Sequence, residues 1–255
     1  DNGTKTPVIT QRFFVSSNLM SIKAQVSSSP LIAQRATHQK INFSVSTNQV
    51  NVQQAENELK TVVMQNANPG LTSVNAVPSF VGPGIIQYND PLSTIFKGGN
   101  EFRRLDLRAQ QTKNLQVKDL SRNKQSYSSQ LDENGKFFII NLEDKDPAIE
   151  NDYIPVDFNL STALPDTSGT LYLVGGLNRY SPNEDFKLTY DYLAHRFRGR
   201  ILLKQGLYDY TYVWKSQTEK GYDDTRFEGT YFETGNSYQI LIYHRKPGNR
   251  WEELV

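Results

Sequence analysis

The sequence contains no cysteine. Disulfide bonds, thiolate nucleophiles and zinc sites with cysteine ligands are therefore excluded, whichever compartment the protein occupies. Long apolar runs are missing as well, because no segment approaches the roughly 20 apolar residues that a membrane-spanning helix needs. No signal-peptide pattern is present either. We therefore expect no direct insertion into a membrane.

A surplus of charge of one sign is also lacking. The 255 residues include 28 Lys and Arg against 27 Asp and Glu, which gives a formal net charge of +1. Proteins that bind DNA, RNA or anionic membranes by bulk electrostatics carry a clear positive excess. The composition therefore gives no reason to expect a nucleic acid as partner.

Aromatic residues are plentiful by contrast, with 14 Tyr and 13 Phe. Such residues can build a hydrophobic core where Leu and Ala are scarce, whereas disordered chains lack them. Alternation of apolar and polar residues, the pattern of a sheet with one buried face, is clearest at Ile41–Ser46 and Ile154–Leu160. Further strands are predicted at 11–16, 20–26, 59–65, 84–88, 102–108, 116–121, 169–174, 186–192, 200–204, 207–214 and 237–245.

Turn signals punctuate these strands. Asn134-Gly135 favours a type I′ turn, so a hairpin is predicted between 126–131 and 137–140. Many short strands without intervening helices indicate β-sandwiches rather than βαβ units. The fold class expected is all-β, with two tandem antiparallel β-sandwich domains; a single large barrel is the alternative at this length.

The segment 143–150 is charged, contains Pro147 and separates two strand-rich halves, as a linker would. We therefore expect a first sandwich over residues 11–146 and a second over 147–255. Residues 1–10 are interpreted as the end of a preceding domain or linker, because the sequence starts at Asp1 with a strand-like pattern.

Residues with catalytic or metal-binding chemistry do not fall into known patterns. His38, His195 and His244 are far apart and lack partners at metal-ligand spacing, so each is interpreted as a surface or structural histidine. A Ser-His-Asp triad need not be contiguous, but no Gly-x-Ser-x-Gly elbow is present. The prediction is a protein that is not an enzyme, with no catalytic residues, no metal and no cofactor.

The segment Gly206–Trp214 places Tyr208, Tyr210, Tyr212 and Trp214 on one side of a strand. With Leu171–Tyr180, it resembles early-set immunoglobulin-like domains, the class that contains starch- and glycogen-binding modules. This resemblance implies such a fold for the second sandwich. It also gives an alternative function, a carbohydrate-binding module of an outer-membrane glycan system, in which Tyr180, Tyr208 and Trp214 would stack on sugars. The competing interpretation is that these aromatic side chains pack in the core.

A longer series of motifs spans nearly the whole chain. It comprises Thr10–Phe13, Tyr88–Asp90, Gly99–Arg103 with Asp106, Asp132–Gly135, Asp152–Tyr153, Leu203–Tyr210 and Glu228–Tyr238. The series resembles the plug proteins of the type IX secretion system, a family long described as a domain of unknown function. Its order and spacing are more specific than any single motif.

The resemblance implies a periplasmic protein, monomeric by itself, that binds a large outer-membrane β-barrel translocon and closes its periplasmic mouth. The family has a further domain before the part matched here. The candidate partner-binding residues are Asn100, Glu101, Phe102 and Arg103, which offer an aromatic anchor and charged groups of the kinds common at binding hot spots. The alternative, which we favour, is that Glu101 and Arg103 hold the first sandwich together.

Overall fold

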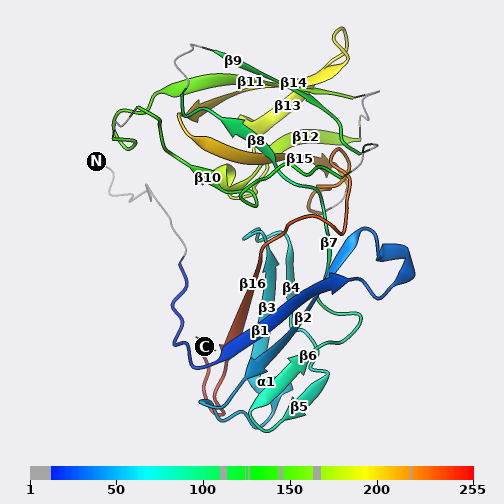
Figure 1. The fold of residues 1–255 in the computed structure, drawn as a ribbon, viewed down its shortest axis with the longest axis vertical. Helices are drawn as coiled ribbons and strands as arrows, with labels where there is room; N and C mark the ends of the chain where they lie inside the picture. The colour runs from blue at the N-terminus through cyan, green and yellow to red at the C-terminus, as the bar shows by residue number, and fades with distance from the viewer. Residues whose placement is uncertain are drawn as a thin grey trace.

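The computed structural model describes residues 13–109, 114–123, 125, 127–143, 146–162, 168–218 and 220–255. It shows two β-rich units stacked along the long axis of the molecule (Figure 1). The unit called here the terminal unit contains residues 13–97 and 237–255, and the inserted unit contains residues 98–236. The prediction for residues 1–10, and the part of the first motif at residues 10–12, lie outside the described residues.

The terminal unit consists of two sheets, with strand orders β1-β2-β6-β5, to which β7 is added by pairing with β2, and β17-β16-β3-β4. Its elements are β1 (Ser21–Ser28), a 3₁₀ turn (Ile32–Gln34), β2 (His38–Ser46), α1 (Ala55–Glu58), β3 (Leu59–Gln65), β4 (Thr72–Val74), β5 (Phe80–Gly82), β6 (Ile85–Tyr88), β7 (Ile95–Lys97), β16 (Tyr238–His244) and β17 (Glu253–Leu254).

The core of the terminal unit lies between these two sheets. The alternation in β2 is confirmed, because Ile41, Phe43 and Val45 are all buried. Val63 of β3 and Ile242 of β16 meet them from the second sheet. Complete burial of aliphatic side chains of this size contributes about 1.5–3 kcal/mol each. The predicted strand at 11–16 is not found over its described residues, which run as an exposed extended segment.

The inserted unit holds one sheet with the order β10-β15-β12-β13-β14-β11-β9, to which β8 is added by pairing with β15. Its elements are β8 (Arg103–Asp106), β9 (Leu115–Leu120), β10 (Phe137–Phe138), β11 (Tyr153–Ser161), β12 (Gly169–Val174), two 3₁₀ turns (Gly176–Asn178 and Glu184–Phe186), β13 (Lys187–Asp191), β14 (Arg196–Lys204) and β15 (Leu207–Ser216).

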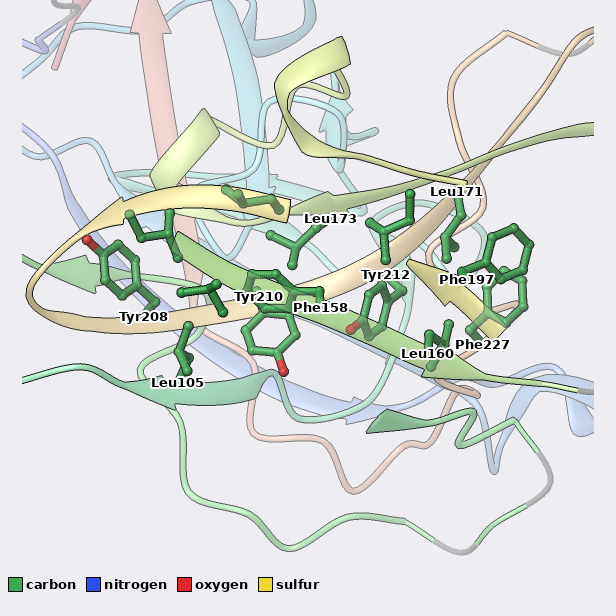
Figure 2. Close-up of a cluster of buried hydrophobic side chains, with 14 of the residues drawn as sticks. Leu105, Phe158, Leu160, Leu171, Leu173, Phe197, Tyr208, Tyr210, Tyr212 and Phe227 are labelled. Atoms are coloured by element: carbon green, nitrogen blue, oxygen red, sulfur yellow. The ribbon is translucent and has the colours of Figure 1, made fainter. Parts of the chain in front are cut away.

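The inserted unit's core is shared by all parts of this sheet. Phe158 and Leu160 of β11 meet Leu171 of β12 and Tyr210 and Tyr212 of β15 in one buried cluster (Figure 2). The tilted aromatic pairs in this cluster, such as Phe158 with Tyr210 at 5.2 Å between ring centroids, add to the area that is buried. The all-β sandwich class predicted from sequence is confirmed; an early-set topology stays a prediction.

The predicted boundary at Asp146/Pro147 does not separate the sheets and is wrong. Strands β8, β9 and β10 pair with β15 and β11 beyond that boundary, whereas β16 returns to pair with β3 over seven residues. The two units are therefore nested, not tandem. A charged, proline-containing segment signals a loop, and the described residues of this segment, 143 and 146–150, form no strand; pairing between distant strands leaves no local signal of this kind.

The Asn134-Gly135 turn forms as expected, with φ of 55° and 80° at these two residues. It does not close a hairpin, however, because residues 127–131 form no strand. The short strand β10 that follows the turn pairs instead with β15. Turn chemistry thus predicted the local backbone correctly and the strand partner wrongly.

Candidate functional site

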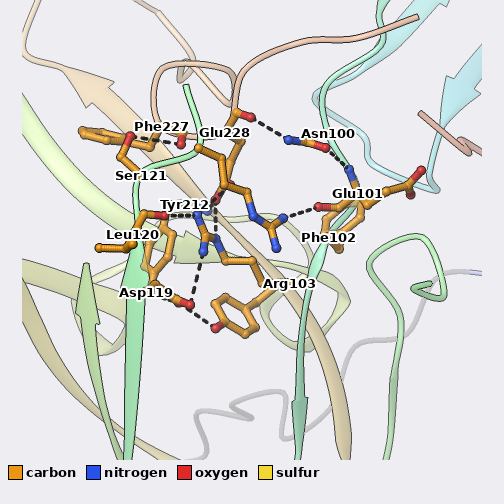
Figure 3. A network of polar contacts seen from close by, with 12 residues as sticks. Asn100, Glu101, Phe102, Arg103, Asp119, Leu120, Ser121, Tyr212, Phe227 and Glu228 are labelled. Carbon is orange, nitrogen blue, oxygen red and sulfur yellow. Dashed lines mark hydrogen bonds and ion pairs between the residues drawn. The ribbon is translucent and has the colours of Figure 1, made fainter. Parts of the chain in front are cut away.

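Arg103, the first residue of β8, lies at the centre of a buried polar network (Figure 3). Its Nε and Nη2 donate to the two carboxylate oxygens of Glu228 at 2.9 and 3.0 Å. Nη2 also donates to the Leu120 carbonyl at 2.7 Å, and Nη1 lies 3.2 Å from an Asp119 oxygen. The guanidinium stands 5.2 Å from the ring centroid of Tyr212. Each of the three guanidinium nitrogens therefore has a hydrogen-bond or ion-pair partner.

The electrostatics of the network match this geometry. Burial alone would lower the pKa of Arg103, but Glu228 and Asp119 together raise it above its ordinary value. Burial, followed by the neighbouring Tyr210 and Asp119, holds the pKa of the Tyr212 hydroxyl well above its usual range. Arg103 is therefore charged and Tyr212 neutral at any physiological pH, so the network is a fixed ion cluster rather than a proton-transfer site.

The two residues before Phe102 are held just as firmly. Asn100 donates from Nδ2 to the Glu228 carbonyl at 2.8 Å. Glu101 is buried, accepts a hydrogen bond from the Tyr127 hydroxyl and accepts another from the Gly235 amide at 2.8 Å. These contacts connect the start of β8 to the segment that leads into β16.

Phe102 connects to the turn that was predicted from Asn134-Gly135. Its amide donates to the Asp132 carboxylate, whose other oxygen accepts from the Asn134 amide at 2.8 Å. The Phe102 ring packs edge-on against Tyr180 at 6.3 Å between centroids. The Tyr180 hydroxyl in turn donates to the carbonyls of Asn66, at 2.9 Å, and Asn134. One tyrosine thus ties the inserted unit to the terminal unit.

Carboxylates are concentrated around this turn. Burial raises the pKa of Asp132 to about 7, with further contributions from the nearby Glu101 and Asp209. Burial also raises the pKa of Asp209, although Arg104 lies within 3.3 Å of it. Both carboxylates accept hydrogen bonds from backbone amides, as groups that fix loops do.

The segment Glu228–Tyr238 completes the contact between the units. Gln39 of β2 donates from Nε2 to the carbonyls of Phe232 and Thr234, both at 2.7 Å. Asn236 donates from Nδ2 to the Gln39 side-chain oxygen at 3.0 Å. Buried amide groups with satisfied partners of this kind fix one relative placement of two structural units.

A small polar cavity of about 40 Å³ lies beside these contacts, in the range that holds a few water molecules. Its walls come from both units and include Gln65, Asn68, Asn100, Tyr222 and Asp224. It is too small for a typical organic ligand, since ligand pockets measure about 300–1,000 Å³.

The partner-binding candidates are therefore corrected. Glu101 and Arg103 are 8% and 5% exposed, and Asn100 and Phe102 are engaged within the chain. Glu101 and Arg103 join β8 to other segments of the inserted unit, which agrees with a structural role for these two residues, although the first tandem sandwich that they were expected to hold is not formed. A partner-binding interpretation stayed open from the sequence because nothing in the motif shows that Glu228, 125 positions away, neutralises Arg103.

The sugar-stacking candidates are corrected as well. Tyr180, Tyr208 and Trp214 are 8%, 3% and 3% exposed, so none offers a ring face to solvent. Trp214 is covered on one face by the Arg226 guanidinium at 4.7 Å. The aromatic ladder of β15 is the core of the inserted unit, as the competing interpretation held.

The histidines do not meet. His38 contacts Thr37, His195 lies in the exposed turn after β13, and His244 is buried with Nε2 3.5 Å from Glu58. Among the described residues, no three His, Asp or Glu side chains gather in a way that could hold a metal ion. Within the same residues, no helix has the length and apolar character needed to cross a membrane.

Comparison with solved structures gives a match that spans most of the chain. The chain superposes with a TM-score of 0.86 on a crystal structure of a hypothetical protein from Parabacteroides merdae, at 27% sequence identity over 94% of the present chain. The match covers 64% of that protein, so the present chain spans less than two thirds of its length. No family model matches the chain, and no curated protein matches it either. The similarity supports the fold and carries no statement of activity.

Proposed function

We propose that this protein is a non-catalytic component of a secretion channel, which seals the periplasmic mouth of the type IX translocon by binding that large outer-membrane β-barrel. The motif resemblance is the origin of this proposal. One observation carries it further: the motif segments Gly99–Arg103, Asp132–Gly135 and Glu228–Tyr238 meet in a single hydrogen-bonded network of the inserted unit, which contacts the terminal unit through Gln39.

The placement of these segments fits a protein that works by keeping its shape. A seal needs bulk and a fixed outline, and it needs no cofactor or titrating nucleophile. The buried Arg103–Glu228 pair fixes segments of the inserted unit against one another, while Gln39 and Tyr180 join the two units. The carbohydrate-binding alternative is not carried further, because its three aromatic residues are buried.

Cross-linking in intact cells tests the proposal. The full-length protein, tagged in its native host, is cross-linked before the envelope is solubilised, and the captured proteins are identified by mass spectrometry. We expect a large outer-membrane β-barrel to be captured in a stoichiometric amount. Capture of soluble periplasmic proteins without the barrel would refute the proposal.

A permeability measurement gives an independent readout. Deleting the gene should admit a large hydrophilic dye that the intact outer membrane excludes, and expression of the wild-type protein should restore exclusion. Dye entry that is unchanged by the deletion would count against a sealing role even if the barrel were captured.

A further inference from the structure

The outward side of the inserted sheet carries a row of arginines. In β14, Phe197, Ile201 and Leu203 point into the core, so the alternate residues Arg196, Arg198 and Arg200 point to the opposite side. This surface, called here the arginine face, consists of the outward side of β9, β11 and β14 together with Thr189–Asp191 of β13, which pair with β14.

Positive charge is concentrated on this face. Its outward positions carry Lys118, Arg196, Arg198, Arg200 and Lys204 against only Asp157 and Asp191, a net charge of +3. The whole chain has a net charge of +1, so the remainder carries −2. The balanced composition therefore hides a strongly polarised molecule, and the partner of this face is expected to be anionic.

Two ion pairs within the chain show how the arginine face binds a carboxylate. Arg200 makes a bidentate ion pair with Asp157, with Nε–Oδ1 and Nη2–Oδ2 distances of 2.6 and 2.9 Å. Arg198 donates from Nη1 to Asp191 Oδ2 at 2.9 Å. The two arginine side chains are 65% and 55% exposed. Exposed pairs with a single contact, such as Arg198–Asp191, contribute little stability, so an incoming carboxylate competes with Asp191 at small cost.

A shallow groove of about 360 Å³ runs between these two ion pairs, over Gly199. Its walls are the Arg198–Asp191 and Arg200–Asp157 pairs. Alternate residues of a strand repeat every 6.6–6.8 Å or so, and the same repeat separates carboxylates placed at every second residue of an extended peptide. Lipid headgroups have no such fixed repeat, and the regular spacing therefore favours a peptide chain over a membrane surface.

The turn after β13 adds an apolar contact beside the arginines. Leu193 is 97% exposed and Tyr192 66% exposed. The turn is held in shape by Asp191, whose Oδ1 accepts from the amides of Leu193 and Ala194 at 3.1 and 3.0 Å. Because Asp191 also binds Arg198, the exposed tip and the arginine row form one continuous surface. Tyr and Arg side chains together are characteristic of interface hot spots.

We propose that the arginine face binds an extended acidic segment of a protein partner, with carboxylates on Arg196, Arg198 and Arg200 and an apolar side chain against Leu193. This names the contact surface of the seal and so rests on the proposed function for its biological partner. The chemistry of recognition is independent of it.

Fluorescence anisotropy of the 255-residue chain tests the recognition directly. The probe is a labelled ten-residue peptide that alternates Glu and Ser and carries one Leu, compared with a peptide in which Lys replaces every Glu. We expect binding of the acidic peptide only, weakening as salt rises from 50 to 500 mM as ion pairing requires. A triple change of Arg196, Arg198 and Arg200 to Ala should lower the affinity at least about tenfold.

A matched control removes the same charge elsewhere. Lys23, Lys60 and Lys246 are replaced by Ala together; they lie in the terminal unit, and the expected loss of affinity is less than about twofold. Equal losses in the two triple variants would overturn the proposal, since binding would then follow net charge alone. Leu193→Asp should weaken binding without touching the arginines, and circular dichroism confirms that each variant is folded.

Vesicles separate a protein partner from a lipid one. Sedimentation with vesicles of phosphatidylglycerol and phosphatidylcholine in equal amounts should leave the chain in the supernatant at 150 mM salt. Binding to these vesicles that depends on the three arginines, with no binding of the acidic peptide, would overturn the proposal. If the peptide binds but the barrel is never captured in cells, the inference holds and the proposed function fails. If the variant with all three arginines changed to Ala captures the barrel as well as the wild-type protein does, the proposed function holds and the inference fails.

Discussion

Replacing Arg103 by Met removes the positive centre of the buried network while nearly keeping the side-chain volume. The change deletes three hydrogen bonds and one further ion pair, and it leaves the Glu228 and Asp119 side chains, 3% and 15% exposed, without their counter-charge. Breaking a buried ion pair by removing one partner costs about 3–5 kcal/mol. We expect a loss of stability of that size.

Urea denaturation followed by tryptophan fluorescence measures this loss. The chain has two tryptophans; Trp214 is buried in the core of the inserted unit, whereas Trp251 is 61% exposed, so the change in signal reports mainly on the inserted unit. With a slope of about 2 kcal/mol per molar urea, the midpoint should fall by roughly 1.5–2.5 M. Lys60→Met, which breaks the exposed pair with Glu252, should change stability by less than about 1 kcal/mol.

The pH dependence of the variant supplies a second check. Without Arg103, the buried carboxylate of Glu228 has no counter-charge, and lowering the pH relieves that uncompensated buried charge. Stability of the variant should then be greater at pH 5 than at pH 8 relative to wild type. An Arg103→Met protein that is as stable as Lys60→Met, or whose deficit is the same at both pH values, would refute the account of the network given above.

Three further predictions concern the segments that connect the units, the tyrosine that bridges them and the turn at Asp132. Gly98→Ala places a methyl group 1.8 Å from the Tyr231 carbonyl oxygen, so it should expose the connecting segments to limited proteolysis, whereas Gly221→Ala, which meets open space but a positive φ, should not. Tyr180→Phe loses two hydrogen bonds, and calorimetry should show a loss of about 1–3 kcal/mol; an unchanged melting temperature would contradict the bridging role. Because the pKa of Asp132 is raised to about 7, stability should fall as pH rises from about 4 through 7, and Asp132→Asn should flatten that slope in thermal melts; a slope equal to that of wild type would be the contrary result.

The sequence predicted those features whose cause is local. Strand β15 is an example: alternation placed Tyr208, Tyr210 and Tyr212 on one side, and all three are in the core. Asn134 and Gly135 likewise took positive φ because their side chains permit it. In each case the residues themselves contain the physical reason.

Features that depend on distant partners could not be predicted in this way. A partner-binding role for Arg103 stayed open because an isolated arginine is normally solvated, and its burial is possible only because Glu228 and Asp119 come from elsewhere in the chain. The nesting of the units escaped prediction for the same reason, since β16 resembles any other amphipathic strand until its pairing with β3 is known. The arginine face was missed because only the alternation of β14 separates Arg198 from the buried Phe197 beside it.

The pairing of β3 with β16 also sets the order in which the molecule can be assembled. Gln65 and Tyr238 are 173 positions apart, and closing a flexible loop of that length by chance is slow and entropically unfavourable. The inserted unit removes most of this barrier once it is folded, because its own ends are then held together by the Tyr231 amide on the Gly99 carbonyl at 2.8 Å. Until then, β3 presents an unpaired edge of the kind that recruits foreign strands. A chain that emerges amino-terminus first therefore has an incomplete sheet through most of its synthesis. Folding of the inserted unit brings β16 next to β3, and the pairing of these two strands then completes the sheet.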